Sequence, residues 1–127
     1  MIACESPASA LMLRGEMKKK AQTDLEDEIY ERQVRICKAF ANPIRLRILD
    51  LLTNGSQSGS SLQQALGITT PHLSQHLAVL RAAGVVTTRR EGKNILCSLT
   101  MPEVKQACQL IRNVLRAQIR NGQKLRV

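Results

Sequence analysis

Aromatic residues are almost absent from this chain, which has one Tyr and one Phe among 127 residues. Proteins that recognise single-stranded RNA stack its bases on exposed aromatic rings, so this composition argues against that mode of binding. Long apolar runs are absent too. None approaches the ~20 residues that cross a bilayer, and the apolar stretch at residues 10–13 is too short for a secretory signal. We therefore expect no membrane segment.

The cysteines are few and scattered: Cys4, Cys37, Cys97 and Cys108 include no Cys-x-x-Cys pair. This spacing is unlike a disulfide framework or a zinc site, so we expect a reducing, cytoplasmic setting with no metal and no cofactor. The sequence also lacks a nucleophile–base pair, a phosphate-binding loop and paired carboxylates. A chain of this length forms one domain without room for a separate catalytic one, and we predict that it is not an enzyme.

Acidic residues are scarce in the C-terminal part of the chain. The formal net charge is +9, and after Leu51 only Glu91 and Glu103 are acidic, against ten Lys or Arg residues. Five of the other eight acids cluster at Asp24, Glu26, Asp27, Glu28 and Glu31. This distribution favours a polyanionic partner for the C-terminal part.

The first 22 residues show no sustained periodicity, and we predict a flexible N-terminal arm there. A helical pattern begins after them, since Thr23 or Asp24 can cap a helix. The positions that then recur at helical spacing are Leu25, Ile29, Gln33, Ile36, Cys37 and Phe40. These residues predict a first long helix.

A second helix is predicted after Asn42, which can cap it, while Pro43 at the first helical position needs no hydrogen-bond donor. Its apolar face is predicted at Ile44, Ile48, Leu51 and Leu52, with Leu49 at the edge. Residues 54–60 form a flexible polar loop that leads to the next element.

Residues 60–98 carry the most specific pattern. Residues 61–68 predict a short amphipathic helix stopped by Gly67, and residues 69–71 open a second helix, residues 72–83, which Gly84 closes. The β-rich runs 85–90 and 95–99, joined by residues 91–94, predict a hairpin. A helix-turn-helix followed by a hairpin is a winged helix, whose second helix can enter the major groove of DNA.

The last helix is predicted from about Pro102 to Gly122. Its apolar stripe comprises Val104, Ala107, Cys108, Ile111, Leu115 and Ile119. The arginines beside that stripe, Arg112, Arg116 and Arg120, are interpreted as a solvated face. The stripe packs either on its own domain or against a second subunit. We favour a homodimer, since winged helices usually bind two half-sites ~34–36 Å apart.

The predicted fold class is mainly α (α+β), a winged helix-turn-helix with a two-stranded β wing and N- and C-terminal dimerisation helices. Residues 1–22 are assigned to the flexible arm, residues 23–122 to the DNA-binding and dimerisation domain, and residues 123–127 to a tail.

Candidate DNA contacts lie on the second helix of the helix-turn-helix at Thr70, His72, Ser74 and Gln75. Gln can bind adenine in bidentate fashion, and Ser or Thr can bind a base or a phosphate. His76 either contacts phosphate or makes a structural hydrogen bond. The core side of the same helix is predicted at Leu73, Leu77 and Leu80.

The wing offers Arg89, Arg90 and Lys93, whose positive charges would reach phosphates or the minor groove. The alternative is a solvated hairpin tip. Glu91 is interpreted as a turn residue. Arg45, near a helix start, contacts the DNA backbone or makes an intramolecular ion pair.

Two segments resemble the ArsR/SmtB metalloregulators. Lys38 to Leu49 is similar to the helix-joining signature of that family, and residues 67–77, 80–86 and 89–93 resemble its recognition helix and wing. The resemblance covers roughly residues 25–115 in the correct order. It implies a homodimeric repressor that leaves a double-stranded DNA operator when an inducer binds.

The resemblance does not extend to the sensor sites of that family. Residues 61–65 lack the Cys-x-Cys pair and residues 100–108 lack histidine. Members that sense sulfur species use one early cysteine and one in the last helix. Cys37 and Cys108 share that general placement, although the early position holds Asp50 here. They are candidate sensor thiols for reactive sulfur, an oxidant or As(III), with buried core cysteines as the alternative. The inducer is unknown.

Cys97 alternates with Ile95 and Leu99, which places it in the core. A different function stays open beside the repressor: a winged-helix protein- or RNA-interaction module without inducer sensing. Such a module would need an exposed apolar patch or exposed aromatic rings.

Overall fold

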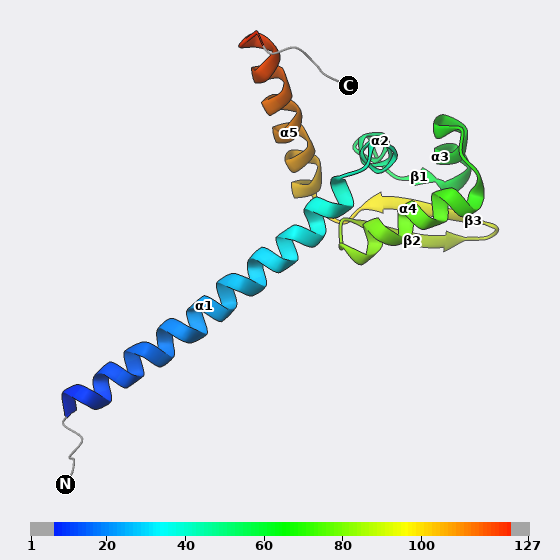
Figure 1. Cartoon of the computed structure of the whole chain (residues 1–127). Coiled ribbons are helices and arrows are strands. Elements are labelled where there is room, and N and C mark those ends of the chain that lie inside the picture. Colours follow the sequence, from blue (N-terminus) through cyan, green and yellow to red (C-terminus); the bar gives the residue numbers. More distant parts are fainter. Residues whose placement is uncertain (1–6, 123–127) are drawn as a thin grey trace. The chain divides into compact units, whose positions relative to one another are not determined.

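The computed structural model describes the backbone of residues 7–122 and the side chains of residues 19–122. In chain order the elements are α1 (Pro7–Phe40), α2 (Pro43–Leu52), β1 (Gln57–Ser58), α3 (Gly59–Leu66), α4 (Thr70–Ala82), β2 (Val86–Glu91), β3 (Asn94–Leu99) and α5 (Pro102–Arg120) (Figure 1). The chain divides into two units at the boundary between Arg35 and Ile36, and each is described by itself.

In the first unit, α1 begins at Pro7, so the predicted start at Thr23 or Asp24 is wrong. Thr23 lies inside the helix, and its hydroxyl donates to the carbonyl oxygen of Lys19 at 2.8 Å instead of capping. The lysine-rich segment before it has good helix propensity without an apolar stripe, which explains why periodicity did not detect it. The mobility of residues 1–22 stays a prediction. Residues 1–6 of the predicted arm, which include Cys4, and the predicted tail 123–127 lie outside the described residues.

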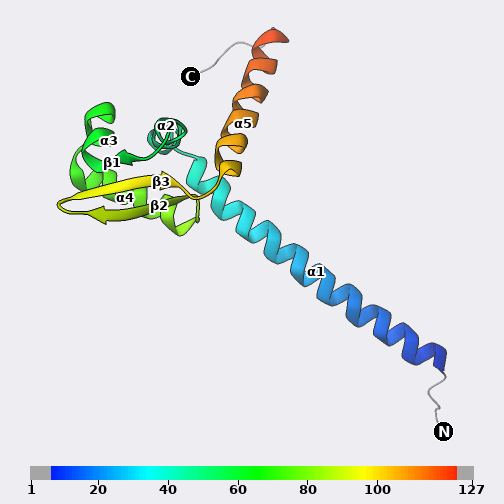
Figure 2. The same cartoon turned by 180° about the vertical axis from the view of Figure 1, so that it is seen from behind.

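The second unit is built on a sheet with the strand order β1-β3-β2, in which both pairings are antiparallel. Helices α2 and α3 contact β3, while α4 contacts β2, and Figure 2 shows α4 beside the hairpin. Part of the predicted polar loop 54–60 proves to be β1, because Gln57 pairs with Cys97 and Ser58 with Leu96. The predicted two-stranded wing therefore gains a short third strand, whose pairing satisfies backbone groups of β3.

Local capping determines where the helices of this unit begin. The Asn42 Oδ1 atom accepts hydrogen bonds from the backbone N–H groups of Ile44 and Arg45, at 2.9 and 3.2 Å, so the predicted cap is confirmed. Thr69 caps α4 in the same way by accepting from the N–H of His72 at 3.3 Å. These caps satisfy backbone donors that have no partner within the helix.

The core joins the inner faces of the helices and of the sheet. Leu73, Leu77 and Leu80 are buried as predicted, and the predicted core position of Cys97 is confirmed at 0% exposure. Leu49 was placed at the edge of α2, yet it too is 0% exposed. The predicted edge position of Leu49 is wrong because α3, α4, β3 and α5 pack around α2 and bury a wider face than one apolar stripe.

Helix α5 is buried only at its start. Val104 lies in the core and Ala107 and Cys108 pack against it, whereas Ile111, Leu115 and Ile119 of the same stripe are exposed. In the part of the chain that the structure describes, no helix has the length and apolar character needed to span a bilayer.

Candidate nucleic-acid interface

The turn between α3 and α4 sets the position of the first candidate residue. Gly67 ends α3 in the left-handed region at φ 67°, which favours glycine because it has no Cβ. The Gln63 side chain crosses the turn, since its Nε2 donates to the Thr70 hydroxyl at 2.9 Å. Thr70 is therefore held at the exposed beginning of α4.

The outer face of α4 is polar and free of acidic residues near its N-terminus. Thr70, His72, Ser74 and Gln75 are all exposed. With 3.6 residues per turn, Gln75 lies opposite the buried leucines, and Ser74 and His72 lie at the two borders of the outer face. Thr70 is exposed because it begins the helix. The partial positive charge of the helix N-terminus favours an anionic partner at this end.

His76 does not belong to this exposed set. It is 8% exposed and packs on the core side, with its Nδ1 atom 3.4 Å from Nη1 of Arg45. The exposure needed for a phosphate contact is lacking, so the structure corrects the placement of His76 among the DNA-contacting residues. The buried position of His76 agrees with the other alternative, a structural hydrogen bond.

In the described part of the chain Arg45 makes no ion pair with a carboxylate, and its contact with the DNA backbone stays a prediction. Its Nε donates to the carbonyl oxygen of Ala39 at 2.7 Å and its Nη2 to that of Lys38 at 3.1 Å, in the last turn of α1. Sequence reasoning missed these bonds because they join residues that no periodicity relates.

The wing residues do not share one face of the sheet. Side chains alternate along a strand, so Thr88 and Arg90 point to the side of the buried Cys97, and Arg89 points to the other side. Arg81 of α4 donates to the Thr88 hydroxyl at 3.2 Å, which identifies the first side as the one that faces α4. Arg90 therefore lies on the side of α4, and Arg89 does not.

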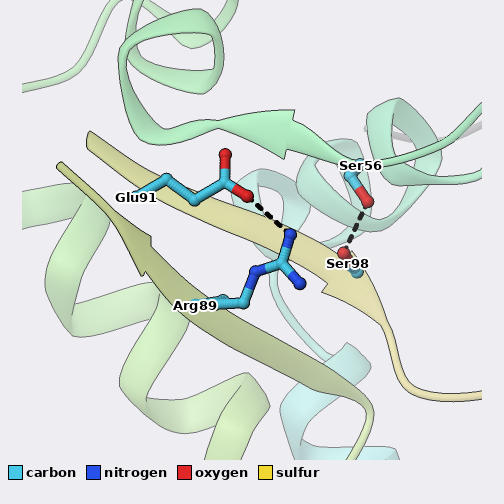
Figure 3. A network of polar contacts seen from close by, with 4 residues as sticks. All are labelled: Ser56, Arg89, Glu91 and Ser98. Atoms are coloured by element: carbon cyan, nitrogen blue, oxygen red, sulfur yellow. Dashed lines mark hydrogen bonds and ion pairs between the residues drawn. The ribbon is translucent and has the colours of Figure 1, made fainter.

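On the other side of the sheet, Arg89 pairs with Glu91 through Nη2 and Oε1 at 2.5 Å (Figure 3). Glu91 ends β2, so its assignment as a turn residue is corrected by one position, and the hairpin turn lies at Gly92 and Lys93. The Lys93 side chain is exposed at this tip. Figure 3 also shows the Ser56 and Ser98 hydroxyls bonded to each other, at 2.6 Å.

The two candidate sensor thiols lie in different surroundings. Cys37 is exposed, whereas Cys108 is half-buried and lines a cavity of about 490 Å³ between α2 and α5. Asp50, which pairs with Arg112 at 3.6 Å, also lines this cavity, and Cys37 does not. Burial, and then the Asp50 carboxylate, raise the pKa of the Cys108 thiol, against a smaller opposing effect of Arg112.

Metal-binding side chains do not gather within residues 19–122: no group of three or more His, Cys, Asp or Glu residues there could hold a metal ion.

Two of the α5 arginines have polar partners. Arg112 pairs with Asp50, and Arg116 donates to Asn113 Oδ1 at 3.2 Å.

Comparison with known proteins identifies the family. Residues 42–88 match the model of the family described as "Bacterial regulatory protein, arsR family". An uncharacterised HTH-type transcriptional regulator of Mycobacterium tuberculosis is 37% identical over 90 residues, which are 70% of this chain and 79% of that protein. The chain belongs to the ArsR family. Proteins of this family are DNA-binding transcriptional regulators and not enzymes.

Two further ArsR-type proteins resemble the chain over more of its length. A biofilm growth-associated repressor of Xylella fastidiosa is 35% identical over 107 residues, 84% of this chain and 86% of that protein. The solution structure of a homodimeric winged helix-turn-helix DNA-binding domain from Mycobacterium bovis, a possible ArsR-family regulator, superposes with a TM-score of 0.69. It is 27% identical and covers 82% of this chain and 95% of its own.

Proposed function

We propose that this ArsR-family chain is a homodimeric repressor that binds a DNA operator and leaves it when an inducer binds. The observation that carries the proposal is the outer face of α4, where four exposed polar side chains surround a helix N-terminus without acidic neighbours. A helix with such a face fits the major groove of B-DNA.

Within this proposal, Gln75 contacts a base edge, because it lies in the middle of the outer face. Ser74 and His72 contact phosphates or flanking bases from its borders, and Thr70 does so from the beginning of α4. On the wing, Arg90 and Lys93 supply positive charge that positions the duplex without reading its sequence. Arg89 reaches DNA only after it separates from Glu91.

The second subunit is proposed from the uncovered part of α5. Ile111, Leu115 and Ile119 are each between 41% and 54% exposed in the single chain, and they continue the stripe that begins in the core. Contiguous exposed apolar surface of this kind marks interfaces. A second copy of the chain would cover it, as is proposed by analogy with the homodimeric domain from M. bovis.

For the inducer we propose a thiol-based signal, namely reactive sulfur, an oxidant or As(III), with Cys37 and Cys108 as the candidate sensors. Support comes from the position of Cys108 in the cavity between α2 and α5, where a modified thiol would disturb the packing of the two helices. Because thiolate is the reactive form, the raised pKa of Cys108 slows its reaction at neutral pH.

The DNA-binding part is tested with the purified protein and a duplex that contains the sequence upstream of its own gene. Gln75→Ala should weaken binding by about 5- to 150-fold for each half-site, the range for one bidentate base contact. Gln106→Ala on exposed α5 is the matched control and should have no effect. Binding no tighter than to unrelated duplex at every salt concentration would refute the operator-binding role.

The thiol part is tested separately on the same duplex, with reduced and polysulfide-treated protein. Affinity should fall after treatment in the wild type, but not in Cys37→Ser or Cys108→Ser. An unchanged affinity of the treated wild type would reject the thiol signal and leave DNA binding intact.

A further inference from the structure

The Arg45 side chain connects two elements that are distant in the sequence. Its Nε and Nη2 groups donate to the carbonyl oxygens of Ala39 and Lys38 at the end of α1, at 2.7 and 3.1 Å. Its remaining Nη1 lies 3.4 Å from Nδ1 of His76, on α4. One guanidinium thus spans the last turn of α1 and the helix proposed to bind DNA.

This contact determines where His76 carries its proton. Arginine remains charged and offers only donors, so the Nδ1 atom of His76 has to be the acceptor. The ring is then neutral, with its proton on Nε2. That Nε2 atom is buried and has no hydrogen-bond partner among the described residues. A second proton would face the Arg45 guanidinium across 3.4 Å.

The groups around the ring all oppose protonation. Burial comes first, followed by His72, whose ring centroid lies 4.8 Å away on α4, and then Arg45 on α2; together they lower the pKa of His76. The last turn of α1 presents to Arg45 the carbonyl oxygens of Lys38 and Ala39. In the described part of the chain no ion pair joins the ring to a carboxylate.

We propose that Arg45 is a positioning residue for DNA binding: through the neutral His76 ring it holds α4 against the last turn of α1, and protonation of His76 breaks this link. The proposal rests on the proposed function, in which α4 contacts the operator. It adds a proton-sensitive control of that contact, located away from the DNA-facing side chains.

The direction of the pH effect follows from the neutral ring. Above the ordinary histidine value near 6.5 the link is fully present, because both the folded and the unfolded chain carry a neutral ring. As the pH falls through the lower pKa of the folded protein, the ring becomes charged and the link is lost. We expect operator affinity to fall roughly tenfold once the ring is charged, about the effect of losing one hydrogen bond.

The chain has two histidines, so the second must be removed from the titration. His72 lies on the exposed side of α4 that is proposed to contact DNA, and its replacement leaves His76 as the one histidine of the sequence. The pH series is therefore measured in His72→Gln, where any histidine titration belongs to His76. In that background, added His76→Gln should abolish the acid-induced loss, and Arg45→Gln should reduce affinity at neutral pH and flatten the profile.

Arg47→Gln, exposed on the same helix, is the matched control and should retain the pH profile of the background. An unchanged profile in a folded Arg45→Gln variant would overturn the proposal. So would an acid-induced loss that persists after His76→Gln.

A second measurement does not depend on DNA. Nitrogen-15 chemical shifts of the imidazole in the full chain should show the tautomer with the proton on Nε2 at neutral pH. A proton on Nδ1, or a charged ring at neutral pH, would overturn the link even if Arg45→Gln failed to fold. Absence of operator binding at every pH would reject the proposed function, and the chemical shifts would still decide the contact.

Discussion

The two faces of the wing predict different roles for two adjacent arginines. Arg90 lies on the side of the sheet that faces α4, and in the described part of the chain no ion pair involves it. Arg89 lies on the opposite side and pairs with Glu91. We therefore expect Arg90→Gln, but not Arg89→Gln, to remove a phosphate contact.

The salt dependence of duplex binding measures the difference. Each lost phosphate contact lowers the slope of log K against log salt by about 0.9. Between 50 and 200 mM salt this corresponds to about 3.5-fold in affinity for one protomer, and to roughly 12-fold for a dimer that loses two contacts. When the salt concentration rises from 50 to 200 mM, the affinity of the wild type should fall by that factor more than the affinity of Arg90→Gln. The affinity of Arg89→Gln should fall as much as that of the wild type.

Folding of the wing should be affected little by either change. The side chains of Arg89 and Glu91 are 72% and 52% exposed, and exposed pairs of this kind contribute about 0.2–1 kcal/mol. Arg120→Gln on exposed α5 controls for the loss of one positive charge. If Arg89→Gln flattened the slope as much as Arg90→Gln, the alternation of the strand would not decide which arginine contacts DNA.

Three further predictions concern stability and reactivity. Asn42→Ala should lower the free energy of unfolding in urea by about 1 kcal/mol, since Oδ1 caps two N–H groups, while Asn113→Ala on exposed α5 should stay within about 0.5 kcal/mol; equal effects would contradict the capping role. Leu49→Ala should cost about 2–5 kcal/mol in the same assay, against a much smaller loss for the 40% exposed Leu46, and the reverse order would contradict the core described above. Cys97 should resist iodoacetamide until the protein unfolds, because it is fully buried and burial raises the pKa of its thiol; rapid labelling of native protein, followed by mass spectrometry, would show that the sheet opens.

The local signals in the sequence predicted most of the winged helix. Asn42, Gly67 and Thr69 act on backbone groups within four residues, so their effect on helix ends follows from the sequence alone. Strand β1 could not be predicted in this way, since its pairing partners lie about forty residues further along the chain. Two polar residues between a glycine and a serine carry no strand signal of their own.

The sequence predicted only part of the candidate site. The exposed residues of α4 follow from its helical period, and the same period would have placed His76 on the face of Leu73 and Leu80. Because histidine is polar, His76 was instead assigned to the DNA-facing side. The Arg45–His76 contact joins residues 31 apart, and it requires the tertiary structure.

The short strand β1 has a consequence for the operator itself. Its pairing with β3, together with the bond between the Ser56 and Ser98 hydroxyls, fastens the base of the wing to the segment that leads into α3. The wing and α4 then form one rigid unit, and the distance between the DNA contacts of the wing and those of α4 is fixed. One base pair inserted within a half-site moves the far contact by about 3.4 Å along the helix axis and also rotates it around that axis. Such an insertion should therefore weaken binding to a half-site more than many single base changes do. A whole helical turn inserted between the two half-sites leaves the spacing of contacts within each half-site unchanged.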